Sequence, residues 1–302
     1  QFAPMKLGKW QGAAMAYAAF WVLCGVVLPL LALIWVSLLP YMQAFSMKAL
    51  GQLGTTGFTQ AVTYMAGPLM NTLMLMVGAV VISVGLSVCI SWIVTRSRSN
   101  LARWSDMLVF LAPAVPTIVM GIAFQNAGIA TYKWLPLFGS IWLIALAMGT
   151  RFIAYCTRTL NAASIQIHYS LDEAALASGV TQFTAFRKIY LPLMFPAIFY
   201  TALLVAMLSA RDLTLPLIMI TEDSQTISTL IFDLQANGAS NAAAALSIYM
   251  ILLLVVLASI AHWVAGMSQP GMLRKVMHGR RGGLFNWRNW VQPGHSQTLP
   301  AE

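Results

Sequence analysis

Long apolar runs separated by short polar segments dominate the chain. A run of about 18 or more apolar residues is long enough to cross the hydrocarbon core of a bilayer as one α-helix. The pattern predicts six such helices, which cover approximately residues 14–38, 71–94, 107–124, 137–157, 193–211 and 242–267. We therefore expect an all-α, polytopic membrane protein with six transmembrane helices.

Composition and the distribution of charge support this interpretation. Hydrophobic residues make up 59% of the 302 positions and charged residues only 8%, whereas soluble globular domains contain about 25% charged residues. The net charge is +9, but nearly all lysines and arginines outside the predicted spans flank one side of them. Only Lys48 and Lys133 fall on the other side. By the positive-inside rule, this asymmetry predicts that both termini are cytoplasmic, and it indicates topology rather than a nucleic-acid partner.

The same pattern divides the chain into three parts. Residues 1–69 comprise an N-terminal lead-in, the first span and a periplasmic loop, residues 70–267 form the core transmembrane domain, and residues 268–302 form a basic cytoplasmic tail. Residues 213–220 are apolar but too short to cross the bilayer, so a re-entrant segment and an interfacial stretch are both compatible with them. The chain begins with Gln1 rather than Met, so we expect a fragment or a processed product.

A polar segment within residues 161–192 interrupts the core domain and carries a spaced motif, EAA-x3-G-x9-I-x-L-P. From ordinary residue frequencies, these seven positions match at a given start with a chance of ~10⁻⁸. The motif residues are Glu173, Ala174, Ala175, Gly179, Ile189, Leu191 and Pro192. The spacing indicates a specific role, because a solvated loop between helices needs no fixed spacing.

The segment also predicts two short helices joined at a glycine. Ser170 and Glu173 have the spacing of an N-terminal capping box, and Gly179 supplies the helix stop. Thr181 is a candidate cap for the second helix, and Pro192 suits the first turn of the next span. The predicted helices cover residues 171–178 and 182–190. Such an elbow, with its alanine-rich surface, allows close approach of another protein.

The motif resembles the cytoplasmic EAA loop of bacterial ABC-importer permeases, the membrane subunits of binding-protein-dependent uptake systems. The similarity extends over roughly residues 70–265 and includes Asn71 to Leu73, Pro113, Pro116, Arg151-Phe152 and Arg211 to Leu213. Together these look like the permeases of iron(III)-type importers, whose relatives move putrescine, thiamine, sulfate or phosphonates. The resemblance implies a type I ABC-importer permease fold in the bacterial inner (plasma) membrane. Iron-type permeases commonly carry two six-span halves in one polypeptide, so the chain looks like the C-terminal half of a fused permease, with a separate subunit as the alternative.

The resemblance implies a translocation subunit rather than an enzyme. Such a subunit passes a small solute, with ferric iron as the first expectation, from a periplasmic substrate-binding protein to the cytoplasm. The other implied partners are a cytoplasmic ABC ATPase dimer, a second permease half and the lipid bilayer. The chain has no G-x-x-x-x-G-K-[ST] phosphate loop, so ATP would be bound by partner subunits, and we expect no catalytic residue, cofactor or metal site. The EAA segment would contact the ATPase, with Phe183 and Phe186 as apolar anchors.

Three ionisable residues in or at the edge of predicted spans are candidates for the transport pathway or its gate: Arg151, Arg211 and Asp212. Charged residues at membrane depth usually face the bundle interior or a water-filled path. For Arg151 we favour a structural ion pair or snorkelling, whereas a gate and an interfacial anchor suit Arg211 and Asp212 equally. Alternatives to a permease are an ion-driven secondary transporter, which needs acidic or histidine relays inside the spans, and an integral membrane enzyme, which needs a polar catalytic cluster.

Replacement of Glu173 by Lys tests the role of the EAA segment. The substitution reverses the charge at a helix N-terminus, where the helix dipole favours a negative charge. We expect weaker association of the ATPase and slower uptake, with unchanged insertion of the permease. Co-purification of the ATPase with membranes measures the effect, and normal association and uptake by the Glu173→Lys variant would show that this segment is not the docking element.

Overall fold

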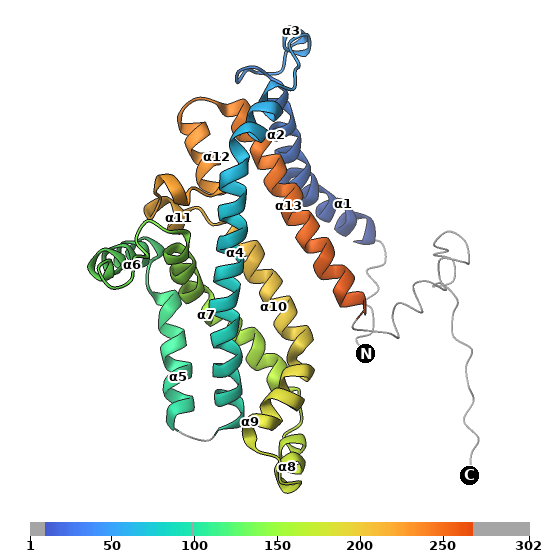
Figure 1. Ribbon diagram of the computed structural model, residues 1–302. Helices are drawn as coiled ribbons and strands as arrows, with labels where there is room; N and C mark the ends of the chain where they lie inside the picture. Colours follow the sequence, from blue (N-terminus) through green and yellow to red (C-terminus); the bar gives the residue numbers. More distant parts are fainter. Residues whose placement is uncertain (1–9, 98–99, 268–302) are drawn as a thin grey trace, which may run out of the picture. The chain divides into compact units, whose positions relative to one another are not determined.

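The computed structural model describes residues 10–97 and 100–267 (Figure 1). Within those ranges the chain consists of helices and the turns between them, so the all-α prediction is confirmed. Residues up to Ala258 form one compact unit, which is the unit described below. The predicted basic tail, residues 268–302, lies outside the described residues.

The helices differ widely in length, from one turn to 41 residues. They are α1 (Gln11–Val22), α2 (Leu28–Leu38), α3 (Met47–Leu50), α4 (Thr56–Arg96), α5 (Asn100–Leu111), α6 (Thr117–Thr131), α7 (Ile141–Ile165), α8 (Ser170–Ala177), α9 (Gln182–Ala185), α10 (Leu191–Arg211), α11 (Thr214–Ile218), α12 (Ile227–Ala236) and α13 (Ser240–Met267). Short π-helical segments, Leu23–Val27 and Phe186–Tyr190, join α1 to α2 and α9 to α10.

Four continuous helical segments among the described residues are long and apolar enough to cross a membrane, and a bent helix pair supplies a fifth if it counts as one span. The four segments are Gly12–Leu38, Thr56–Arg96, Gln182–Arg211 and Ser240–Trp263. α7, which covers most of the predicted fourth span, has 25 residues and therefore sufficient length, but it carries Arg151 and Arg158. A multi-pass membrane protein is thus confirmed, while the count of six spans stays a prediction.

The predicted second span is only part of α4, which is about 60 Å long at 1.5 Å per residue. The glycines and polar residues before Asn71 predict a loop, whereas the structure has helix from Thr56. Tertiary packing explains the difference. A Cβ added at Gly57 would lie 2.7 Å from the Ser37 carbonyl oxygen, and Ala61 is fully buried in a cluster with α12 and α13. These contacts with neighbouring helices outweigh the weak local helix propensity.

The prediction of one continuous third span over residues 107–124 is wrong. The structure breaks there into α5 and α6, whose axes are bent by 105°. Pro113 and Pro116 lie at the break, with a short 3-10 turn at Ala112–Ala114. Val115, directly before Pro116, has the extended backbone that a following proline favours. Because neither proline can donate a backbone hydrogen bond, the helix ends at this point and restarts in a new direction.

Close packing of α4 against α7 forms the centre of the main core. Gly78 and Gly149 allow this approach: an added Cβ would lie 2.7 Å from Ala145 Cβ at the first position and 2.6 Å from Ile82 Cγ2 at the second. Met148 of α7 is fully buried in the same cluster. Without a hydrophobic driving force between helices in lipid, such small-residue contacts are what hold transmembrane helices together.

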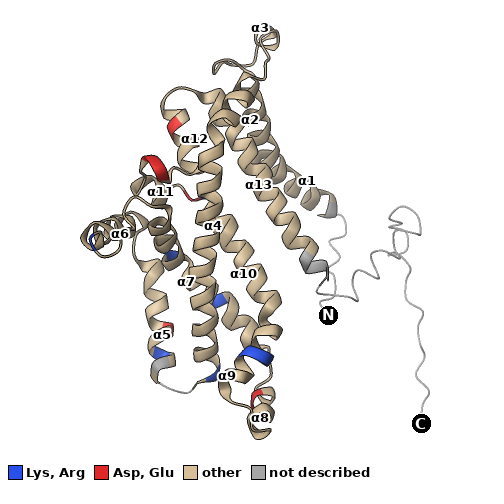
Figure 2. Ribbon diagram, in the orientation of Figure 1, with Lys and Arg blue, Asp and Glu red and all other residues tan. Residues whose placement is uncertain are grey.

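Basic residues lie at the end of the bundle that carries α8 and α9, beside the acidic residues of α8, and further acidic residues lie near α11 and α12 (Figure 2). Arg96 is the last residue of α4, and Arg187 and Lys188 directly precede α10, so these three lie at the end that carries α8 and α9. The acidic residues Glu222 and Asp223 lie in the connection between α11 and α12, at the other end of α10. The basic residues near α8 and α9 agree with the charge asymmetry in the sequence, and the orientation of the termini stays a prediction.

Two glycines of α4 provide a matched test of the helix contact. Gly78→Ala should destabilise the protein by about 1–3 kcal/mol, because the added methyl group overpacks the interface with Ala145. Gly85→Ala meets no atom within 4 Å and should stabilise α4 by about 0.4–1 kcal/mol through the lower entropy of the unfolded chain. Thermal unfolding of the purified variants in detergent measures both effects. Equal melting temperatures for the two variants would contradict the close approach.

Candidate functional site

The EAA segment folds into the predicted helix–glycine–helix elbow between α7 and α10. α8 ends at a left-handed turn, in which Gly179 has a φ of +78°. The amide of Val180 donates to the Ala175 carbonyl at 3.1 Å, and the amide of Gly179 donates to the Leu176 carbonyl at 3.0 Å. These are the two hydrogen bonds of a Schellman motif. A Cβ added at Gly179 would have nothing within 4 Å, so backbone conformation rather than space requires glycine there.

Of the two helix caps predicted for the elbow, the structure has one and lacks the other. The capping box of Ser170 and Glu173 is wrong, because α8 already begins at Ser170 and no side chain caps it. The Ser170 hydroxyl is instead hydrogen-bonded to His168 Nδ1 at 2.8 Å. Thr181 is confirmed as a cap, since its Oγ1 accepts a hydrogen bond from the Thr184 amide at 3.4 Å. Beyond α9 the helix continues into α10, with proline in its first turn as predicted.

The motif residues and the two predicted aromatic anchors differ in exposure. The exposed members are Glu173, Ala174, Gly179, Phe183 and Pro192, and the buried or half-buried members are Ala175, Phe186, Ile189 and Leu191. The ring of Phe186 lies 5.1 Å from that of Trp92 and 5.7 Å from that of Tyr190, so this side chain packs inside the bundle. Phe183 is 70% exposed and is the anchor that another protein can reach.

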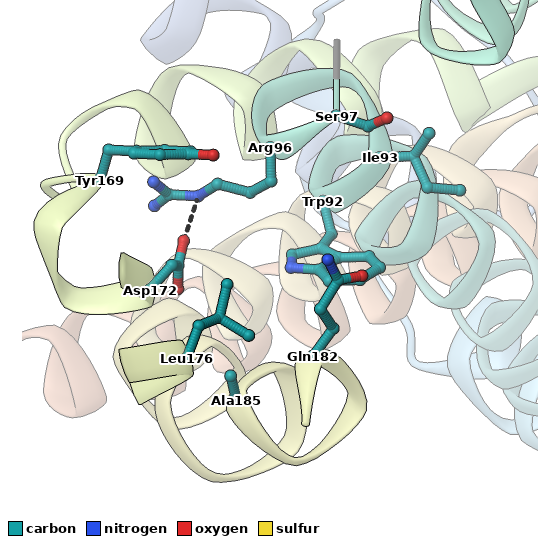
Figure 3. Close-up of a pocket in the computed structure, with 9 residues that line it drawn as sticks. All are labelled: Trp92, Ile93, Arg96, Ser97, Tyr169, Asp172, Leu176, Gln182 and Ala185. Carbon is teal, nitrogen blue, oxygen red and sulfur yellow. Dashed lines mark ion pairs between the residues drawn. The ribbon is translucent and has the colours of Figure 1, made fainter. Parts of the chain in front are cut away.

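An ion pair attaches the elbow to the end of α4 (Figure 3). Arg96 Nε lies 3.1 Å from Asp172 Oδ2, and these side chains are only 9% and 19% exposed. Arg96 Nη2 also donates to the Ile167 carbonyl at 2.9 Å, and the guanidinium carbon lies 5.7 Å from the centre of the Tyr169 ring. Arg96 thus contacts α8 and the chain that precedes it at three points.

A cavity of about 440 Å³ lies beside this ion pair. Trp92 and Arg96 line it from α4, and Tyr169, Asp172 and Gln182 line it from the elbow (Figure 3). The Arg96–Asp172 pair and the packing of Phe186 on Trp92 both attach the elbow to α4 around this cavity. Tyr190 also donates a hydrogen bond to Ser164 at 3.0 Å, which joins the segment directly before α10 to α7.

The sequence contains Arg96 and Asp172, but no local pattern in it shows that they pair. Arg96 suits the positive-inside pattern, and Asp172 suits the first turn of a helix. The pairing depends on the hairpin-like return of α7 beside α4, which brings together residues 76 positions apart. The available signal is the position of each residue, since both lie where a predicted helix ends or begins at the same membrane face.

The three candidate pathway residues, by contrast, do come together. Arg151, Arg211 and Asp212 line a second cavity of about 440 Å³, together with Phe152, Tyr155 and Thr214. Arg151 Nη1 forms an ion pair with Asp212 Oδ2. Asp212 Oδ1 accepts from the Thr214 amide at 2.9 Å, so the same carboxylate also caps α11. The ion pair therefore joins α7 to the end of α10, and both residues of the pair line the cavity.

Among the described residues, no three histidine, cysteine, aspartate or glutamate side chains lie close enough together to hold a metal ion. The features that the chain offers are thus an exposed elbow, a buried charge that attaches it, and a separate charged cavity. These features suit contact with a partner protein and movement of a solute.

The fold is that of ABC-transporter membrane subunits. The inward-facing MetNI methionine ABC transporter gives a TM-score of 0.57 at 13% identity, with 68% of this chain and 96% of that chain covered. A bacterial alginate ABC transporter, in complex with an alginate pentasaccharide-bound periplasmic protein, gives a TM-score of 0.62 at 14% identity, with 82% and 91% covered. At such low identity these similarities concern the fold alone.

Residues 87–274 match the family described as binding-protein-dependent transport system inner membrane component, and the chain belongs to this family. Its members are ABC-transporter permeases of the inner membrane, which are not themselves enzymes. The predicted resemblance to permeases of this class is confirmed.

The names of the sequence relatives state different transported solutes. An Fe(3+)-transport system permease of Haemophilus influenzae is 24% identical over 53% of this chain and 31% of its own length. A sulfate transport system permease of Salmonella typhimurium is 31% identical over 36% and 42%. A putative 2-aminoethylphosphonate transport system permease of Salmonella choleraesuis is 24% identical over 54% and 62%. The chain matches less than two thirds of the length of each of these relatives.

A double-mutant cycle tests the attachment of the elbow by Arg96 and Asp172. Arg96→Gln and Asp172→Asn should each destabilise the protein by about 1–3 kcal/mol, because each leaves a buried charge without its partner. Their effects should be non-additive, with a coupling energy of about 0.5–3 kcal/mol. Thermal unfolding and limited proteolysis within residues 168–190 are the measurements.

The ion pair between Arg158 and Asp106 serves as the matched control for this cycle. Its atoms lie 3.5 Å apart, and its side chains are 48% and 31% exposed. An exposed pair contributes only ~0–1 kcal/mol, so Arg158→Gln and Asp106→Asn should be almost additive. A cycle on Arg96 and Asp172 that is no more coupled than this control would show that the pair does not hold the elbow.

Proposed function

We propose that the chain is a translocation subunit of an ATP-driven importer, which accepts a small solute from a periplasmic binding protein and releases it to the cytoplasm. The observation that carries this proposal is the elbow: a short helix with a fixed left-handed end, attached to α4 by a buried ion pair and exposed on its outer surface. A cytoplasmic ATPase dimer is the partner that such a surface suits.

The proposed docking surface consists of exposed side chains on α8 and α9. Glu173 and Ala174 lie on α8, and Phe183 on α9 presents an apolar side chain that is 70% exposed. Leu171 is also exposed, at 45%, whereas Leu176, at 44%, lines the cavity beside the Arg96–Asp172 pair. A cluster of exposed apolar residues with small neighbours resembles the anchor residues of protein interfaces. The buried or half-buried residues Ala175, Phe186, Ile189 and Leu191 would support this surface from behind, and the exposed Gly179 and Pro192 would shape its backbone.

The basic residues near the elbow support a cytoplasmic position for it. Arg96, Arg187 and Lys188 lie at this end of the bundle, and positive residues favour the cytoplasmic face. The binding protein would then contact the opposite end, near Glu222 and Asp223. With one elbow in this chain, a second permease half, fused or separate, would complete the pathway between two ATPase subunits.

Uptake by membrane vesicles that contain the complete complex tests this proposal. With ATP inside and a loaded binding protein outside, wild-type vesicles should accumulate cargo and hydrolyse ATP. Candidate binding proteins would carry Fe³⁺, sulfate, 2-aminoethylphosphonate, putrescine or thiamine, because the relatives and the fold leave the cargo open. Ion-driven uptake by this chain alone, without ATPase or binding protein, would show that it is a secondary transporter instead.

Substitution of Gly179 links the elbow to transport within the same assay. Gly179→Val should uncouple ATP hydrolysis from uptake, because a β-branched residue at φ +78° costs about 1–2 kcal/mol and distorts the end of α8. Gly179→Asn is the matched control, since asparagine tolerates this backbone conformation and should keep most of the uptake. Equal uptake by both variants would contradict a role for the elbow geometry in coupling.

A further inference from the structure

Two guanidinium groups and one carboxylate line the charged cavity between α7 and α10, so one positive charge there has no negative partner among the described residues. Arg151 and Asp212 form an ion pair, and the remaining carboxylate oxygen of Asp212 accepts hydrogen bonds from the amides of Thr214 and Leu215 at 2.9 and 3.4 Å. Both oxygens of this carboxylate are therefore already bound. Arg211 is exposed, and within the described part of the chain it has no ion pair, hydrogen bond or aromatic contact.

Arg151 and Arg211 lie at different depths along their helices. α10 begins at Leu191, so Arg211 lies about 30 Å along the helix, which is the thickness of the hydrocarbon core. Arg151 lies ten residues after the start of α7, about 15 Å along it. An arginine facing lipid at the centre of a membrane costs ~2.5–3.5 kcal/mol on insertion scales. The ion pair with Asp212 avoids much of that cost for Arg151, whereas Arg211, at the end of α10, lies where a long side chain reaches water.

We propose that this cavity is part of the solute path and that it selects for anions, with Arg211 as the residue that contacts the cargo. The inference rests on the proposed function and adds a substrate class to it. A guanidinium group presents parallel N–H donors that match carboxylate, sulfate or phosphonate oxygens. The Arg151–Asp212 pair contributes no net charge and holds α7 beside α11, so it positions the cavity wall while Arg211 supplies the attraction.

The proposed site is weak, as a transport path requires. A single solvent-exposed guanidinium attracts an anion without enclosing it, and the volume of about 440 Å³ leaves room for hydration water. Conduction needs binding strong enough for entry but weak enough for release. Cationic solutes such as polyamines are disfavoured by this charge, and ferric iron would pass as a negatively charged chelate rather than as the bare ion.

Cysteine labelling in the assembled complex measures the potential inside the cavity without any transport. Thr214 is exposed and lines the cavity, so Thr214→Cys is introduced after replacement of Cys24, Cys89 and Cys156 by alanine. An anionic methanethiosulfonate, with a sulfonate group, is compared with a cationic one, with a trimethylammonium group. The ratio of the anionic to the cationic rate should fall roughly threefold or more when Arg211→Gln is added, as Coulomb's law indicates for one unit charge at this range.

Lys133→Gln serves as the matched control, because Lys133 is exposed outside the cavity and its removal should leave the ratio unchanged. If Thr214→Cys fails to insert, Tyr155→Cys replaces it, since this residue lines the same cavity and is 54% exposed. A ratio that favours the cationic reagent, or that does not change with Arg211→Gln, would overturn the proposal.

Transport provides the second measurement. In vesicles with the complete complex, Arg211→Gln should slow uptake of an anionic cargo on the order of tenfold, the effect of losing one charge-assisted hydrogen bond, and Arg211→Lys should restore most of it. Normal uptake by Arg211→Gln would refute contact with the cargo. The two proposals can fail separately. If Arg211→Gln lowers the labelling ratio as expected, but the protein neither binds an ATPase nor uses ATP, the importer proposal is refuted and the anion-selective cavity is retained.

Discussion

The close approach of α4 and α7 is the contact on which the rest of the described bundle depends. Two glycines, Gly78 and Gly149, allow the backbones to approach until any added methyl group would overlap Ala145 or Ile82. In a membrane, where lipid is as apolar as the side chains, such van der Waals contact is a main source of helix association. α10 then packs against both helices, with Tyr190 and Met194 buried among them. Both charged sites are built on this three-helix core.

The elbow and the charged cavity are connected through the same two helices. α7 carries Arg151 at the cavity and continues to the segment whose Ile167 carbonyl binds Arg96. α10 begins at the elbow and ends at Arg211. α7 and α10 are therefore the elements through which a displacement of the elbow would reach the Arg151–Asp212 pair. An ion pair between two helices can form or separate as they shift, which makes it suitable as a two-state contact.

Several hydroxyl groups inside this bundle find a partner on a neighbouring helix, where the low dielectric of the membrane penalises an unpaired polar group. Thr157 donates to Ser87 at 3.0 Å, and Ser87 donates to the Ile153 carbonyl at 3.1 Å, so hydroxyl groups join α4 to α7 alongside the glycine contacts. Nearer the elbow, Thr95 and Ser164 lie 2.7 Å apart. These hydrogen bonds fix the register between the helices, because apolar packing alone would tolerate a small slide.

The sequence by itself determined the features that depend on local chemistry. Membrane spans follow from the length of apolar runs, and Gly179 and Thr181 mark helix ends because only certain residue types suit those backbone positions. Tertiary structure alone decided the extension of α4 to Thr56, since that helix is stabilised by distant neighbours. It also decided the 105° bend between α5 and α6, because prolines mark a break without setting its direction. The pairs Arg96–Asp172 and Arg151–Asp212 join residues 76 and 61 positions apart, so their existence depends on how the helices pack and not on any local pattern.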